Sequence, residues 1–201
     1  AWQEELIRRS EDEEKSAYFN QVLNMLVSLS FGALYVLLPL TALVFTLVIN
    51  GEFAAALPYT LLLYFETIIS TFTLHFSSVF VLAKDGKRHL LTTCASALVS
   101  IVFMTALGKL FGLYGVVFGA VIGSFFRNGI CRAYAKQSVA IQMPWKALAV
   151  NTGLYILVLI AVLKANAWQL WALLLLGVVL AVWLTRCTLR GVWQMILSRK
   201  K

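Results

Sequence analysis

The stretch FGLYGVVFGAVIG at residues 111–123 decides which kind of fold this chain can adopt, because it combines an apolar run with four glycines. In water, glycines at this density would weaken a helix. A lipid bilayer tolerates them, since the absence of water forces the backbone to form its hydrogen bonds within the helix. Gly115, Gly119 and Gly123 follow the small-xxx-small spacing of helix contacts in membranes. We therefore expect these three glycines to pack against a neighbouring helix.

The composition of the whole chain agrees with a membrane setting. Of its 201 residues, 61% are hydrophobic and 13% are charged, and the mean hydropathy is +0.84. A soluble domain of this length does not carry such an excess of apolar residues. The sequence predicts an all-α polytopic membrane protein.

Six segments are long enough to cross a bilayer, which takes about 17–25 apolar residues. They cover residues 22–49, 57–83, 90–108, 112–134, 147–163 and 168–186. Pro39 is expected to kink the first helix, and Pro58 to begin the second.

The basic residues predict how these spans are oriented. With six spans, both termini and the loops at 84–89 and 135–146 share one side of the membrane. That side holds 15 of the 17 lysines and arginines, and the other side holds only Lys109 and Lys164. Because basic residues collect in cytoplasmic loops, both termini are predicted to be cytoplasmic. The net charge of +8 then reflects topology and some affinity for anionic membrane lipids, not nucleic-acid binding.

Polar side chains recur at helical spacing in the first four spans. The stripes are Asn20, Asn24, Ser28 and Tyr35; Tyr59, Glu66, Ser70, Thr73 and Ser77; Thr93, Ser96 and Ser100; and Ser124, Arg127 and Asn128. The last two spans are nearly bare, apart from Asn151, Thr152 and Tyr155 near one end. We expect four helices around a polar cavity and two outer helices next to lipid. The alternative is that the hydroxyls only bond to backbone carbonyls or join helices.

Glu66 is the only acidic residue well inside a predicted span. An ionised carboxylate at the centre of a membrane costs about 2.5–3.5 kcal/mol, so the side chain should face water or a partner. It is predicted to bind a proton or cation, or to contact a substrate. The alternative is a structural pair with Arg127 or with another polar helix.

Two further ionisable residues are site candidates. His75 could titrate near neutral pH, although a hydrogen-bonded packing role is favoured for it. Arg127 is placed where it could meet a phosphate group from the cytoplasmic half, and a guanidinium suits phosphate geometry. It could equally extend to the interface without binding anything.

The sequence shows no nucleophile–base pair, phosphate loop or metal-ligand spacing, and its three cysteines are best explained as buried small residues. We expect no enzyme activity, cofactor or metal. The chain opens with Ala-Trp and acidic residues, which suggests the C-terminal part of a longer protein.

Three motifs in order carry a family resemblance. They are LVINGEFAAALPYTLLLYFETIISTF at 47–72, LAKDGKRHLL at 82–91 and FGLYGVVFGAVIGS at 111–124. Over residues 20–136 the chain resembles the C-terminal lobe of polysaccharide flippases, including O-antigen flippases, in the multidrug/oligosaccharidyl-lipid/polysaccharide (MATE-like) exporter superfamily. Residues 147–186 match a helix pair that some members append.

The resemblance implies a domain division into a connector or helix end at 1–20, a four-helix transporter core at 21–136, and an appended helix pair with a basic tail at 137–201. It implies alternating-access flipping of undecaprenyl-pyrophosphate-linked oligosaccharide in the bacterial inner membrane, for polysaccharide or lipopolysaccharide biosynthesis. The partners implied are this lipid-linked glycan, the N-terminal lobe and the glycan polymerase machinery.

Other functions remain open at this point. The nearest is a MATE-type proton- or sodium-coupled drug or cation antiporter, in which Glu66 would bind the ion. A membrane-embedded glycan polymerase or ligase generally has large extracytoplasmic loops, whereas the predicted ones here are short. A non-transporting scaffold would keep Ser70 and Thr73 out of contact with water.

Overall fold

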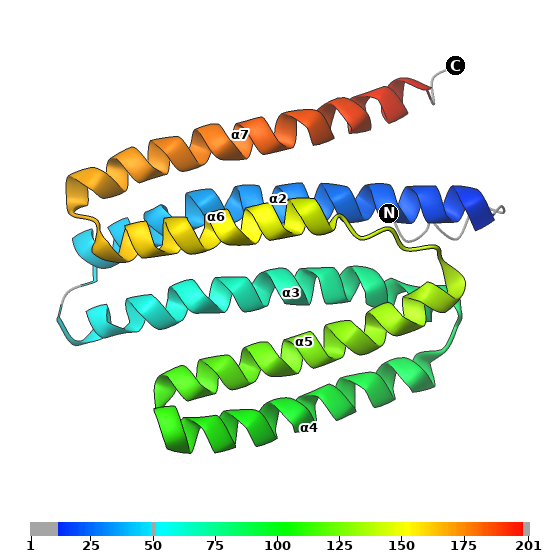
Figure 1. The fold of residues 1–201 in the computed structure, drawn as a ribbon, viewed down its shortest axis with the longest axis horizontal. Coiled ribbons are helices and arrows are strands. Elements are labelled where there is room, and N and C mark those ends of the chain that lie inside the picture. Colours follow the sequence, from blue (N-terminus) through cyan, green and yellow to red (C-terminus); the bar gives the residue numbers. More distant parts are fainter. Residues whose placement is uncertain (1–11, 50, 199–201) are drawn as a thin grey trace. The chain divides into compact units, whose positions relative to one another are not determined.

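The computed structural model describes the backbone at residues 12–49 and 51–198, and the side chains at 15–49 and 53–186. All the regular secondary structure in this part of the chain is helical, and the part contains no strand (Figure 1). The elements are α2 (Asp12–Leu47), η1 (Gly51–Ala56), α3 (Leu57–Leu82), α4 (Gly86–Phe111), α5 (Leu113–Ser138), α6 (Trp145–Lys164) and α7 (Ala167–Ser198).

Six of these helices are long and apolar enough to cross a membrane, which confirms the predicted fold class and number of spans. The candidate spans are Lys15–Leu47, Phe53–Leu82, Gly86–Phe111, Leu113–Ser138, Trp145–Lys164 and Ala167–Arg186. The described part of α2 already includes Asp12, so this helix extends further towards the N-terminus than the predicted span at 22–49. Pro58 lies in the first turn of α3 as predicted, and Pro39 lies inside α2. The chain is a multi-pass membrane protein.

The described chain groups into two compact units, each built from two separate stretches of sequence. One unit comprises residues 12–23 and 62–143, and the other comprises 24–61 and 144–198. Helices α2 and α3 contribute to both units. The first unit therefore contains the start of α2, most of α3, and all of α4 and α5. The second unit contains the rest of α2, the start of α3, and α6 and α7.

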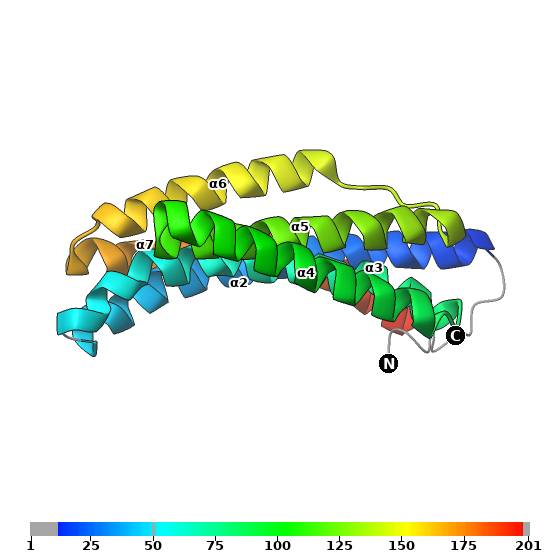
Figure 2. The same ribbon diagram turned by 90° about the horizontal axis from the view of Figure 1, so that it is seen from below.

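In the first unit, α4 and α5 form a close antiparallel hairpin that both views show side by side (Figures 1 and 2). Gly112 joins the two helices with φ +59° and ψ −139°, a conformation that residues with a Cβ rarely adopt. The three ridge glycines lie against α4: Gly115 at Leu107, Gly119 at Met104 and Gly123 at Ser100. Added Cβ atoms would overlap α4, so the small-xxx-small spacing sets the distance between the helices.

The start of α2 holds the linker that follows α5. The Asn20 side chain donates from Nδ2 to the carbonyl of Ala140 and accepts at Oδ1 from the Gln142 N–H, both at 2.8 Å. Ser16 Oγ accepts from the Ala140 N–H at 3.1 Å. These bonds satisfy backbone groups that have no helix or sheet partner.

In the second unit, α6 and α7 do more than border lipid. A Cβ on Gly177 of α7 would overlap the backbone carbonyl of Tyr35 on α2, and one on Gly32 would lie 3.5 Å from Ala181. Helix α6 is tied in by two phenol hydroxyls. Tyr35 donates to the carbonyl and Oδ1 of Asn151, both at 3.0 Å, and Tyr155 donates to the Leu61 carbonyl at 2.7 Å. Asn151 and Tyr155, the polar residues predicted near one end of these spans, are buried and so serve packing within the second unit.

We expect Tyr35→Phe to lower the free energy of unfolding by about 0.6–1.7 kcal/mol, because it deletes the hydroxyl that joins α2 to α6. Unfolding of the purified protein in mixed micelles by dodecyl sulfate measures the effect. Thr105→Val is the control, since the exposed Thr105 hydroxyl bonds only to Ile101 of its own helix. Equal stabilities of the two variants would show that the Tyr35 bond contributes nothing.

Candidate functional site

The polar stripes predicted on the second and fourth spans meet in the first unit. Helical spacing puts Glu66, Ser70 and Thr73 on one side of α3, and puts Ser124 and Asn128 one turn apart on α5. These five residues form what we call the α3–α5 polar cluster. The structure brings two separate stripes of the sequence into hydrogen-bond contact.

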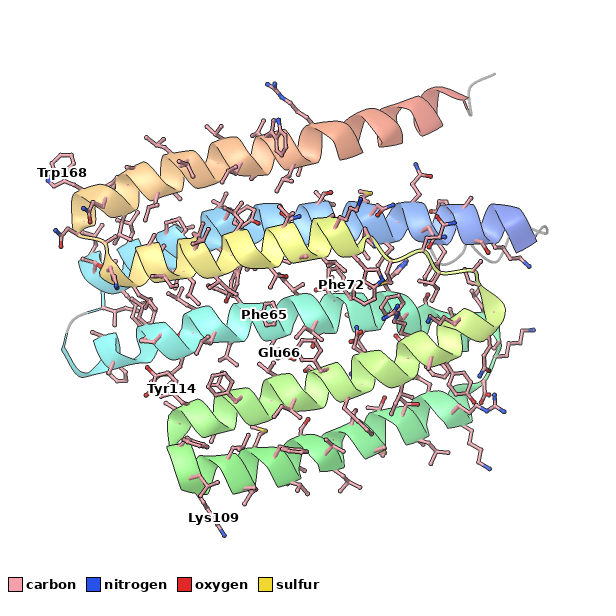
Figure 3. The ribbon with its side chains drawn as sticks, in the orientation of Figure 1. Phe65, Glu66, Phe72, Lys109, Tyr114 and Trp168 are labelled. Atoms are coloured by element: carbon pink, nitrogen blue, oxygen red, sulfur yellow. The ribbon has the colours of Figure 1, made fainter. Side chains whose placement is uncertain are left out.

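Glu66 lies at the centre of the cluster. Its Oε1 accepts hydrogen bonds from Ser70 Oγ at 2.7 Å and from Ser124 Oγ at 2.5 Å. Figure 3 shows Glu66 on α3, on the side of α5. The side chain is only half-buried, and Oε2 accepts no hydrogen bond from any described residue. One carboxylate oxygen is thus held by protein hydroxyls and the other is left for a different partner.

A second link joins the same helices. Asn128 Nδ2 lies 3.1 Å from Thr73 Oγ1, to which it donates, and 3.5 Å from the Ile69 carbonyl. Thr73 is buried, and its hydroxyl donates to Ile69 at 2.7 Å. The cluster therefore continues along α3 from Glu66 towards the helix end that carries the 84–89 turn.

Arg127 lies one residue before Asn128 on α5, but its side chain contacts α4 and not Glu66. Its Nη2 is 3.5 Å from Thr93 Oγ1, and its Nε is buried without an acceptor in the described chain. The buried Cys131 thiol lies next to the guanidinium. Within the residues described, Arg127 makes no ion pair with a carboxylate, so the alternative of a Glu66–Arg127 pair is wrong. Glu66 instead bonds to another polar helix, the other structural alternative.

His75 and Asn24 do not join the cluster. His75 is buried with its ring centroid 4.1 Å from that of Phe19 and Nε2 3.2 Å from the Phe19 carbonyl, a packing arrangement. Asn24 has an exposed side chain, and its carbonyl accepts from Ser28. The stripe predicted on the first span therefore does not act as one surface: Asn20 binds the 139–144 linker and Tyr35 binds Asn151.

Many other hydroxyls bond to carbonyls of their own helix, as the alternative interpretation expected. Thr93, Ser96 and Ser100 on α4 all do so. In the α3–α5 polar cluster, by contrast, Glu66–Ser124 and Asn128–Thr73 join side chains of two helices around a carboxylate. The four-residue spacing of Ser124 and Asn128 places both on one side of α5, but the sequence held no signal that this side faces α3.

The described residues include no group of three histidine, cysteine, aspartate or glutamate side chains that could hold a metal ion. The cluster's chemistry is that of a carboxylate, three hydroxyls and an amide. Such a set can hold a proton on Glu66, or exchange its internal bonds for bonds to hydroxyl or ammonium groups of a bound molecule.

No protein-family model, curated protein or solved structure matches this chain.

Proposed function

We propose that the protein is the C-terminal lobe of a transporter that flips undecaprenyl-pyrophosphate-linked oligosaccharide across the bacterial cytoplasmic membrane by alternating access. The observation that carries the proposal is the α3–α5 polar cluster, with a half-buried carboxylate inside a membrane-spanning helix. A purely anchoring helix would have no use for a carboxylate there, because its insertion costs about 2.5–3.5 kcal/mol. Ionisable groups in such positions mark transport pathways.

The polar groups suit a saccharide cargo. Sugar hydroxyls both donate and accept hydrogen bonds, and the cluster offers hydroxyls, an amide donor and the unoccupied Oε2 of Glu66 as matching partners. Binding would exchange bonds within the protein for bonds to the glycan, so no polar group need be left unpaired in the membrane.

Arg127 suits the pyrophosphate that joins such a glycan to its lipid. Its buried Nε has no acceptor among the described residues, and its charge has no carboxylate partner there. An arginine presents several N–H donors in a planar fork that matches phosphate oxygens. In this proposal the lipid tail stays in the bilayer while Arg127 holds the phosphate and the cluster holds the sugars.

The close α4–α5 hairpin supports the alternating-access part of the proposal. Ridge glycines packed on a helix backbone make the pair a stiff body. Stiff helix pairs are what transporters rock around a central site. The hairpin carries Arg127 and Ser124, so its movement would carry them too.

The first test compares cells with and without the full-length gene. The proposal expects loss of glycan from the cell surface together with lipid-linked glycan accumulating on the cytoplasmic leaflet. Restoring the gene with Arg127→Lys tests the phosphate role, because a lysine keeps the charge but not the fork. Normal glycan on both leaflets, in cells shown to have no second flippase, contradicts the proposal.

A proton- or sodium-coupled drug or cation antiporter is the second candidate. The observation in its favour is that Ser70 Oγ and Ser124 Oγ both lie within 2.7 Å of Glu66 Oε1, which brings three hard oxygen atoms together. Efflux of a small organic cation driven by an imposed proton or sodium gradient, and lost in Glu66→Gln, would favour this candidate.

A further inference from the structure

The end of the α4–α5 hairpin opposite Gly112 carries a concentration of positive charge. We call it the basic hairpin end; its cations are Lys84, Lys87, Arg88, Arg132 and Lys136. Asp85 is the only carboxylate in the same segments, 84–89 and 132–138. At the other end of the hairpin, Lys109 is the only charged residue (Figure 3).

Asp85 bonds to both the backbone and the side chain of Arg88. Its Oδ1 accepts from the Arg88 N–H at 3.1 Å, which caps α4, and its Oδ2 lies 3.0 Å from Arg88 Nε. The carboxylate therefore fixes the position of Arg88 from one side. It leaves Lys84 and Lys87, both exposed, without a carboxylate from this turn.

Arg88 is also held from the other helix of the hairpin. Its guanidinium carbon lies 5.1 Å from the centroid of the Tyr134 ring on α5, a cation–π contact. Tyr134 in turn packs with its ring centroid 5.1 Å from that of Phe80 on α3. The Arg88 side chain is nevertheless 56% exposed. Three helices thus position one arginine whose Nη groups donate to no carboxylate of the described chain.

The location decides which anion this end meets. It lies where α3, α4 and α5, all long enough to cross a membrane, reach the edge of their apolar segments. The phosphates of lipid headgroups are always present at that depth of the membrane. Basic clusters beside membrane helices attract the lipids whose headgroups carry a net negative charge. The N-terminus of α4 adds positive potential at the same place.

We propose that the basic hairpin end binds the headgroup phosphate of an anionic phospholipid, with Arg88 on Tyr134 as its centre and Lys87 beside it. This site is separate from the α3–α5 polar cluster, and the inference does not depend on the proposed transport function. A lipid bound there would hold the α3–α4 turn and the end of α5 at the membrane surface.

The test uses the full chain reconstituted in phosphatidylcholine vesicles with a trace of spin-labelled phosphatidylglycerol or spin-labelled phosphatidylcholine. Electron paramagnetic resonance gives the immobilised fraction of each lipid, and their ratio measures the preference for the anionic headgroup. We expect Arg88→Gln to lower this preference about fivefold, the factor that one basic residue contributes at an anionic surface. The double variant, with both Arg88→Gln and Lys87→Gln, should lower the preference further than Arg88→Gln alone.

Lys109→Gln is the matched control, because it removes one positive charge from the other end of the same hairpin. Tyr134→Leu keeps every charge but removes the ring under Arg88. It should lower the preference by a smaller factor than Arg88→Gln does. An unchanged preference in the Arg88 and Lys87 variants overturns the proposal. So does an equal loss in Lys109→Gln, which would indicate unspecific attraction. Circular dichroism of each variant separates loss of the site from loss of the fold.

Discussion

Replacing Gly119 by alanine is expected to lower the free energy of unfolding by about 1–3 kcal/mol, the range for an added carbon that a packed interior cannot accommodate. An added Cβ would lie 2.5 Å from the backbone nitrogen of Met104 and 2.6 Å from its Cα. Both atoms belong to the α4 backbone, so no side-chain rotation can relieve the overlap and the helices must move apart. Unfolding in mixed micelles measures the change.

Gly129→Ala supplies the control on the same helix, because a Cβ there meets nothing within 4 Å. Its stability should equal or slightly exceed that of the wild type, since alanine is the better helix former. A leucine at position 119 should prevent the hairpin from closing, which a cross-link between cysteines introduced on α4 and α5 would report. If Gly119→Ala and Gly129→Ala are equally stable, α4 and α5 do not pack through the glycine ridge.

Glu66→Gln is expected to leave the fold intact and to reduce transport about ten- to a hundredfold. A glutamine oxygen can still accept from Ser70 and Ser124, so the link between α3 and α5 is preserved. What is lost is the negative charge, and hydrogen bonds to a charged group contribute about 1.5–3 kcal/mol. The readout is surface glycan in a strain that carries only the variant gene, together with the amount of protein in the membrane.

Glu66→Leu separates structure from function at the same position. It leaves two hydroxyls without their acceptor, so both stability and transport should fall, whereas glutamine should affect transport alone. Thr67→Val, one residue along α3, removes an exposed hydroxyl that bonds to its own helix and should change neither. Full transport by Glu66→Gln would make Glu66 a structural residue.

The candidate site was predictable only in part. The helical spacing identified Glu66, Ser70, Thr73, Ser124 and Asn128 as members of two stripes, and the structure joins these two. It does not join Asn24 or His75 to them, and it directs Arg127 towards Thr93. The sequence cannot tell which stripes meet. The spacing of residues fixes the side of their own helix on which they lie, but it does not fix which other helix packs against that side.

The sequence by itself determined the membrane class, the six spans and the close contact expected of the glycine ridge. These follow from local rules: lipid requires each spanning segment to satisfy its backbone within a helix, so length and apolarity are enough to find it. Tertiary structure alone decided that Ser124 is the partner of Glu66 and that Tyr35 and Asn151 join α2 to α6. It also decided that the chain divides into two units within α2, after Leu23, and within α3, after Leu61. Those choices depend on how each helix is rotated about its axis and on how closely neighbouring backbones approach. Small residues and hydrogen bonds between segments far apart in the chain set both.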